Sequence, residues 1–307
     1  METKASQILK DIIETNQFPK DDDKYYHLVL FLLVSEGRNL KLADSTNHMA
    51  DFMAKEMLKV HPDFKDMDLD AFKIELSQPA SLNLEAAMKG LPLVVDLEPI
   101  LIVEQTGARK FITSDNPLVR YNSFYLSKNY PRGFGYITRG LQLFFPISPR
   151  TCILLYDSVA YDIPEKRNGI LTLKKARDVD LLNELFYLNA YNNVFFNQTT
   201  KKDYIEGIHY KNSRTPKIND LEREIVSYNS TDSNSKLIAM SPNKVNKKIN
   251  FPWIKNSDYT NSLKIPAHMG GLNRMESPFI RKFLEQEKKK YGHGRQPSSE
   301  KYFREEI

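Results

Sequence analysis

The chain has 307 residues, 41% of them hydrophobic and 27% charged, which is long enough for a sizeable core and ordinary for a soluble globular protein. Its single cysteine excludes a disulfide framework, and its longest apolar run, Leu28 to Val34, is too short to cross a bilayer. The charged residues Glu2, Lys4, Lys10 and Asp11 leave no apolar stretch of the length that a signal peptide needs, so we expect a cytoplasmic protein with no membrane segment.

The net charge of +5 arises in the C-terminal third of the chain. Residues 201–307 contain 21 Lys and Arg against 13 Asp and Glu, a net charge of +8, which leaves −3 for residues 1–200. A basic segment of this kind favours nucleic acid or another polyanion as a partner. A solvated basic surface explains the same charge, and both alternatives remain open.

Helical periodicity dominates the first 98 residues. The expected helices span residues 5–15, 24–38, 44–60, 70–76 and 82–97. The third of them carries Met49, Phe52, Met53, Met57 and Val60 on one face, and we expect this face to fill gaps in the core.

Strand patterns follow, and they end at a long helix. The expected strands span residues 100–105, 110–113, 117–121, 141–147, 151–156 and 159–163. Residues 122–140 form an aromatic loop, and a helix is expected at 173–196. The predicted fold class is therefore α+β, with a helical N-terminal half packed on a small, mostly antiparallel sheet, a long helix after it, and an irregular basic C-terminal region.

The amino-acid composition of the chain changes near residue 200. Residues 211–250 are rich in Lys, Asn and Ser with only short apolar islands, so we expect irregular chain there. A last helix is expected from Phe279 to about Tyr291. We divide the chain into a core domain, residues 1–200, and a basic C-terminal region, residues 201–307.

The stretch Phe111–Pro117, with the sequence FITSDNP, is the feature around which the expected sheet is organised. Apolar residues enter and leave it, so we expect it at the centre of the sheet. Asp and Asn accept backbone hydrogen bonds in tight turns, so turn chemistry alone explains the composition. In the alternative, Ser114, Asp115 and Asn116 face a pocket and form a catalytic site.

Arg150 follows a second polar corner, Pro146-Ile147-Ser148-Pro149. Its guanidinium can form a structural ion pair with a carboxylate such as that of Asp115, or bind a ligand phosphate. In the catalytic alternative Arg150 stabilises developing negative charge, and Glu104 lies close by.

Motifs for metals and nucleotides are missing from the sequence. None of the six histidines has a Cys or a second His at metal-ligand spacing, and Gly133 and Gly135 lack the rest of any nucleotide fingerprint. We therefore expect no metal and no cofactor. Cys152 lies in an apolar run with no neighbouring His, so we expect a buried thiol and not a nucleophile.

A basic cluster near the C-terminus is the candidate nucleic-acid site. Its cations are Lys282, Lys288, Lys289, Lys290 and Arg295, together with Arg281. The rings of Phe283 and Tyr291 accompany them, and rings beside phosphate-binding cations are typical of nucleic-acid surfaces. A solvated helix with interspersed Glu285 and Glu287 gives the same pattern, so this alternative also stays open.

The FITSDNP turn, followed by Phe145-Pro146-Ile147-Ser148-Pro149 and a helix near Lys174, resembles a bacterial family known as domain of unknown function 4238. Arg38 stands where that family tends to carry an Arg, and the resemblance covers residues 20–200. The His-Tyr-Val-Pro-like opening of the family is missing here. The resemblance implies a shared turn but no established activity, and it suggests a role in phage defence or genetic conflict.

Two functions follow from these patterns. The first is a binding module whose basic C-terminal third contacts nucleic acid or a protein partner, with the α+β body as its scaffold. The second is an effector enzyme, for example a phosphodiester hydrolase, with its site at Ser114, Asp115 and Asn116. The sequence predicts no oligomeric state.

Overall fold

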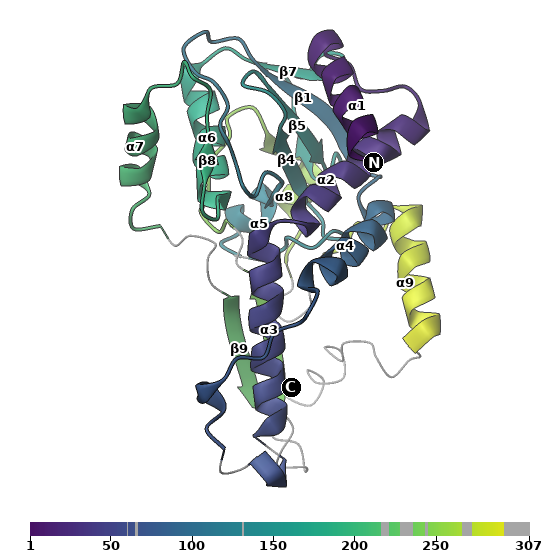
Figure 1. Ribbon diagram of the computed structural model, residues 1–307. Helices are drawn as coiled ribbons and strands as arrows, with labels where there is room; N and C mark the ends of the chain where they lie inside the picture. The colour runs from purple at the N-terminus through teal and green to yellow at the C-terminus, as the bar shows by residue number, and fades with distance from the viewer. Residues whose placement is uncertain are drawn as a thin grey trace.

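A five-stranded sheet forms the centre of the computed structural model, which describes residues 1–59, 61–64, 67–130, 132–215, 221–227, 236–242, 245–265 and 272–291 (Figure 1). Its strand order is β3-β4-β5-β1-β7, and only the β1–β7 pair is parallel. The strands are β1 (Glu98–Glu104), β3 (Val119–Tyr121), β4 (Gln142–Pro146), β5 (Thr151–Tyr156) and β7 (Ile170–Leu173). Helices cover both faces, so the predicted α+β class is confirmed.

The N-terminal helices cover one face of the sheet. They are α1 (Glu2–Thr15), α2 (Asp22–Gly37) and α4 (Pro79–Gly90), which leads into a 3₁₀ turn, η3 (Leu91–Leu93). Asp21 begins α2 by accepting a hydrogen bond from the Lys24 N–H, as a capping carboxylate does. Ile12, Leu32 and Leu155 are buried in the core between these helices and the sheet.

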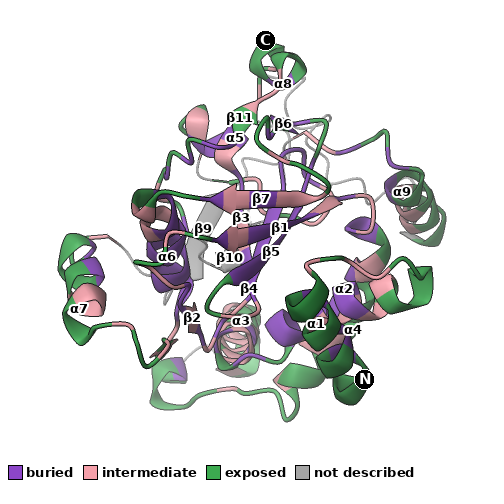
Figure 2. Ribbon diagram, turned by 90° about the horizontal axis from the view of Figure 1, so that it is seen from above, coloured by how far each residue is buried: buried purple, intermediate pink, exposed green. Residues whose placement is uncertain are grey.

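The other face is covered by helix α6 (Ala176–Asn189), by two shorter helices, α5 (Ser123–Ser127) and α7 (Lys202–Lys211), and by residues 245–254. Side chains of β5 alternate between the faces, as a pleated strand requires: Leu154 joins this second core and Leu155 the first. Figure 2 shows the buried sheet between its covering layers. A strand covered on both faces reads as a continuous apolar run, which is the sequence of β5.

Helix α3 (Leu40–Leu58) projects away from the sheet, followed by the 3₁₀ turns η1 (Pro62–Phe64) and η2 (Leu69–Ala71) (Figure 1). The expected core face on this helix is wrong: the exposed fractions of Met49, Met53 and Met57 rise from 38% through 50% to 72%. The buried residues of α3 are Lys41 and Thr46 near its base. The helix extends away from the central sheet, so its apolar side chains become less covered toward its C-terminal end. Val60 lies outside the described residues.

Residues after 200 form more regular structure than expected. The chain between 211 and 250 contains an antiparallel strand pair, β9 (Leu221–Ser227) and β10 (Lys236–Pro242). The two apolar islands are register partners, since Val226 lies opposite Leu237. Each apolar stretch is short, and the two form regular structure by pairing with each other as antiparallel strands. The last described elements are β11 (Lys255–Asn256), α8 (Asp258–Ser262) and α9 (Pro278–Tyr291).

The C-terminal region is tied into the same core as residues 1–200. Ile249, Phe251 and Trp253 are buried in the core of the second face, and the Tyr121 hydroxyl accepts a hydrogen bond from the Ile249 N–H at 2.7 Å. Strand β11 pairs with β6 (Tyr161–Asp162). The tight buried packing means that part of this basic region contributes to the stability of the core.

The FITSDNP turn lies at an edge of the sheet and not at its centre. It connects β2 (Thr113–Ser114), which pairs with β8 (Val194–Phe195), to the edge strand β3. The helix expected at 173–196 ends at Asn189, because the chain after it turns back to form β8.

Cys152 is buried in β5, and burial raises the pKa of its thiol above the ordinary range. We expect the folded protein to react with a disulfide reagent such as 5,5′-dithiobis(2-nitrobenzoic acid) at least about a hundredfold more slowly than the protein in denaturant, because only an exposed thiolate attacks. Release of the coloured thiolate measures both rates. Equal rates would show that β5 opens readily.

Candidate functional site

The carboxylate of Asp115 binds the backbone of a segment 76 residues further along the chain. Its Oδ1 accepts the N–H of Tyr191 at 3.0 Å, and its Oδ2 accepts those of Asn192 and Asn193 at 2.8 and 3.0 Å. The Asp115 N–H in turn donates to the Asn193 carbonyl at 3.2 Å. Both carboxylate oxygens therefore hold the loop that follows α6.

Asn116 is 3% exposed and joins the end of α6 to the start of α3. Its Nδ2 donates to the Asn189 carbonyl at 3.0 Å, and the Asn189 Nδ2 donates to the Asn116 carbonyl at 2.8 Å. Its Oδ1 accepts from Nδ2 of Asn39, whose own Oδ1 caps α3 by accepting the Leu42 N–H. We call Asn39, Asn116 and Asn189 the asparagine clasp.

The other polar groups of the turn are used within the fold. Ser114 Oγ donates to the Asn116 carbonyl at 3.1 Å and accepts the Asn116 N–H at 3.2 Å. Two residues after Asn189, the Tyr191 hydroxyl donates to Asp44 on α3 at 2.7 Å, and this bond is the first cause of the raised pKa of Tyr191, about 12. The turn thus braces the base of the projecting helix.

Arg150 is exposed at the tip of the β4–β5 connection, where its N–H donates to Ser148 Oγ at 3.1 Å. Its carbonyl accepts the N–H of Glu104. The carboxylate of Glu104 is buried and binds Lys110 Nζ at 2.7 Å. Within the described residues, Arg150 forms no ion pair with Asp115, the carboxylate that the sequence suggested, whose oxygens accept backbone N–H groups instead.

A family model described as "Protein of unknown function (DUF4238)" matches residues 1–200. The chain belongs to the DUF4238 family. The search of curated proteins returned no match, and the search of solved structures returned none. The DUF4238 region contains the FITSDNP turn and every partner of Asp115 and Asn116 named above, so the bonds that brace α3 lie within the family's own residues.

The basic cluster lies on α9, on the side of the molecule opposite α7 (Figures 1 and 2). Ile280 is fully buried and anchors the helix, whereas Arg281, Lys282, Lys288 and Lys289 are exposed. The pKa of Glu85 on α4 is lowered first by Lys89 and also by Lys290, so the end of α9 lies beside α4. Arg295 lies outside the described residues.

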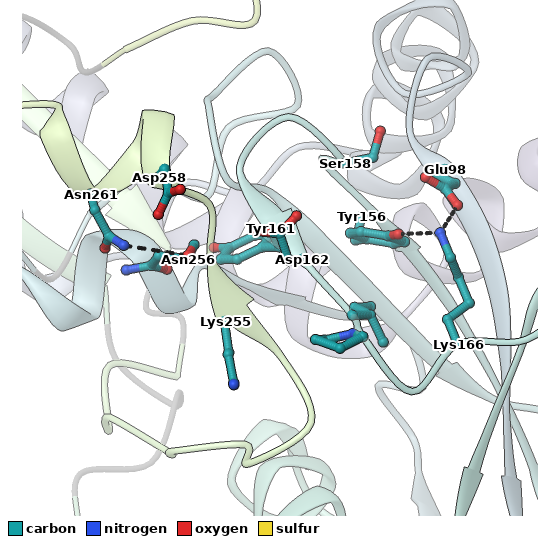
Figure 3. Close-up of a pocket in the computed structure, with 12 residues that line it drawn as sticks. Glu98, Tyr156, Ser158, Tyr161, Asp162, Lys166, Lys255, Asn256, Asp258 and Asn261 are labelled. Carbon is teal, nitrogen blue, oxygen red and sulfur yellow. Dashed lines mark hydrogen bonds and ion pairs between the residues drawn. The ribbon is translucent and has the colours of Figure 1, made fainter.

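A groove of about 840 Å³ opens where β11 joins β6 (Figure 3). Lys166 Nζ lies there between the Glu98 carboxylate and the Tyr156 hydroxyl, with 2.9 Å to the latter. Asp162 and Lys255, which are register partners, also line the groove. Because its charges have both signs, this groove has no preference for a polyanion. In the ranges described, no group of three His, Cys, Asp or Glu side chains is placed to hold a metal.

Sequence reasoning missed a cavity between the Thr106–Lys110 loop and the start of α7. Arg109, Thr200, Lys201 and Tyr204 line it. The available signal was weak: two short stretches, TGARK and TTKK, combine threonine with adjacent cations at separate places in the chain. Among the helices of the described ranges, none has both the length and the apolarity of a membrane span.

Proposed function

We propose that this protein is a nucleic-acid-binding module that contacts its partner through α9. The observation that carries the proposal is the set of four exposed cations on this helix, Arg281, Lys282, Lys288 and Lys289, which have no acidic partner within the described part of the chain. Elsewhere many cations are already neutralised, as Arg120 is by Glu36. Unpaired cations on a rigid helix release condensed counterions when they meet phosphates.

The spacing of these cations suits a phosphate backbone. Residues seven apart on a helix lie on one line about 10 Å long. Lys282 and Lys289 therefore form one column, and Arg281 and Lys288 a second beside it. Phe279 is 44% exposed one turn before Lys282, and an exposed ring supports base stacking. Glu285 lies between the two columns and opposes the binding of phosphate.

We expect the double variant Lys282→Gln/Lys289→Gln to bind nucleic acid more weakly than the parent protein. The slope of log K against log salt should fall by about 1.4 to 1.8, since each phosphate contact contributes about 0.7 on single strands and 0.9 on duplex DNA. Fluorescence anisotropy of labelled single-stranded and duplex oligonucleotides from 50 to 300 mM salt measures the slope.

The matched control is Lys20→Gln/Lys24→Gln, which removes two exposed cations at the start of α2 and should leave the slope unchanged. Glu285→Gln should strengthen binding, because it removes the repulsive charge between the columns. If the parent protein binds neither oligonucleotide at 50 mM salt, or if the two double variants behave alike, the proposal is wrong.

We further propose that the protein acts in the cytoplasm, in phage defence or genetic conflict. These two parts of the proposal are supported by the sequence alone. A hydrolytic site at Ser114, Asp115 and Asn116 has less support. The acceptor atoms of Asp115 bind three backbone N–H groups, and a general base needs a free lone pair directed at its substrate.

A further inference from the structure

The cavity beside α7 has a volume of about 460 Å³, within the range of small-molecule sites. One wall is formed by residues 107–110, and the other by Thr199, Thr200, Lys201, Asp203 and Tyr204. The first residues of α7 line it, and α7 and α9 lie on opposite sides of the molecule (Figures 1 and 2). Its lining includes the cations Arg109, Lys110 and Lys201 and the hydroxyl-bearing Thr200, which are donors suited to an anion.

The loop wall is organised by the buried carboxylate of Glu104. Its Oε1 accepts from the Thr106 hydroxyl and the Gly107 N–H at 2.7 and 2.8 Å, and its Oε2 accepts from Lys110. Burial alone would raise the pKa of Glu104, but these bonds outweigh it and lower the pKa. Glu104 therefore stays ionised and holds the loop in one conformation.

Arg109 is held with part of its guanidinium free of protein partners. Its Nε donates to Asp180 at 2.8 Å, and its plane lies over the ring of Tyr204, 4.5 Å from the centroid. The Tyr204 hydroxyl donates to the same Asp180 oxygen at 2.7 Å. Nη1 contacts only the carbonyl of Ala108, at 3.3 Å, and no bond is formed by Nη2 within the described part of the chain. A guanidinium oriented by stacking and by one carboxylate is typical of phosphate recognition.

The opposite wall offers neutral donors. Thr200 Oγ1 is shielded from solvent and has no hydrogen-bond partner in the described structure. Helix α7 begins just after it, and its N-cap residue, Lys201, makes no side-chain capping bond. A hydroxyl without a partner and the first amides of a ten-residue helix are suited to bind the oxygens of one anion.

The surroundings are positive although some cations are paired. The N–H groups of Glu104 and Gln105 donate to the carbonyls of Arg150 and Leu173, which places the chain around both residues at this end of the sheet. Four exposed cations lie on these segments: Arg150, Lys174, Lys175 and Arg177. Among the described residues that line the cavity, Asp203 is the acidic one. Its negative charge repels an anion, so removing this charge should strengthen binding, whereas removing a cation should weaken it.

We propose that this cavity binds the phosphate group of a small phosphorylated ligand. Arg109 would pair with the phosphate oxygens, Thr200 would donate its hydroxyl, and Lys201 and Lys110 would supply positive charge. The proposal is independent of nucleic-acid binding at α9, since the two surfaces share no residue.

Isothermal titration calorimetry of the full chain with inorganic phosphate, pyrophosphate and adenosine triphosphate tests this site. We expect pyrophosphate and the nucleotide to bind more tightly than phosphate, because they place more charge among the same donors. Arg109→Gln should weaken binding about tenfold or more, since it removes a charge-assisted pair. Thr200→Val should weaken it severalfold with little change of shape.

Asp203→Asn should strengthen binding severalfold, which a merely destabilised protein would not do. The α9 variant Lys282→Gln/Lys289→Gln is the control and should bind the small ligands like the parent. If none of the three ligands binds at millimolar concentration, or if the Arg109, Thr200 and Asp203 variants bind like the parent, the cavity is not a phosphate site.

Discussion

Arg274→Ala should lower the free energy of unfolding by about 3–5 kcal/mol, the cost of breaking a buried ion pair on one side. Arg274 is 2% exposed. Its Nε and Nη2 hold the two oxygens of Asp96 at 2.9 and 3.0 Å, while Nη1 binds the Thr138 carbonyl. Nη2 also binds the Leu93 carbonyl at 2.6 Å. Removing the guanidinium takes away the partner of the Asp96 carboxylate and of the Leu93 carbonyl, whereas the Thr138 carbonyl still accepts the Leu141 N–H. Urea denaturation followed by circular dichroism measures the loss.

Arg281→Ala is the matched control, because this arginine is exposed seven residues later and should change the unfolding free energy by less than about 0.5 kcal/mol. Arg274→Lys keeps the charge but lacks the planar fork, so its loss should fall between the two. A loss below about 1 kcal/mol for Arg274→Ala would mean that the segment leading to α9 is not held by this residue.

Asn116→Ala should lower the free energy of unfolding by about 2–5 kcal/mol, because each buried polar group that loses its partner costs about 1–3 kcal/mol. The groups left behind are Nδ2 of Asn39 and the carbonyl of Asn189. Since Asn39 also caps α3, we further expect faster amide hydrogen exchange at the base of that helix. Denaturation and hydrogen exchange measured by mass spectrometry test the two effects.

Arg150→Ala provides the contrast for the turn, since its exposed side chain should contribute less than about 0.5 kcal/mol. A structural turn predicts a large loss for Asn116→Ala and almost none for Arg150→Ala. A catalytic site predicts a different result: both variants keep the stability of the parent protein, and both lose the cellular phenotype. Stability equal to the parent in Asn116→Ala would contradict the asparagine clasp.

The bracing of α3 gives a physical reason for the shared sequence of the turn. The apolar stripe of α3 is exposed and the helix projects from the sheet, so few core contacts hold it in place. Hydrogen bonds donated by Asn39 to Asn116 and by Tyr191 to Asp44 fix its base instead. A short polar turn can therefore be typical of a family through a structural role at the base of this helix.

Local features of this protein were accessible to prediction from sequence. The capping carboxylate of Asp21, the apolar run of β5 and the burial of Cys152 depend on residue type and on near neighbours. The α+β class followed from the change of hydrophobic period near residue 98. A helix cap depends on the residue at the helix start, and a strand that is buried on both faces has a continuous apolar run, so both can be read from a few consecutive residues.

The tertiary structure decided which groups meet. Asp115 binds amides that follow it by 76 to 78 residues, and Arg274 binds a carboxylate 178 residues before it, and no spacing rule predicts such pairs. The stripe of Met49, Met53 and Met57 has the period of a buried face, yet burial requires an opposing element, and α3 extends past the elements that could supply it. Periodicity states which residues share a face, and only the packed chain states what covers it.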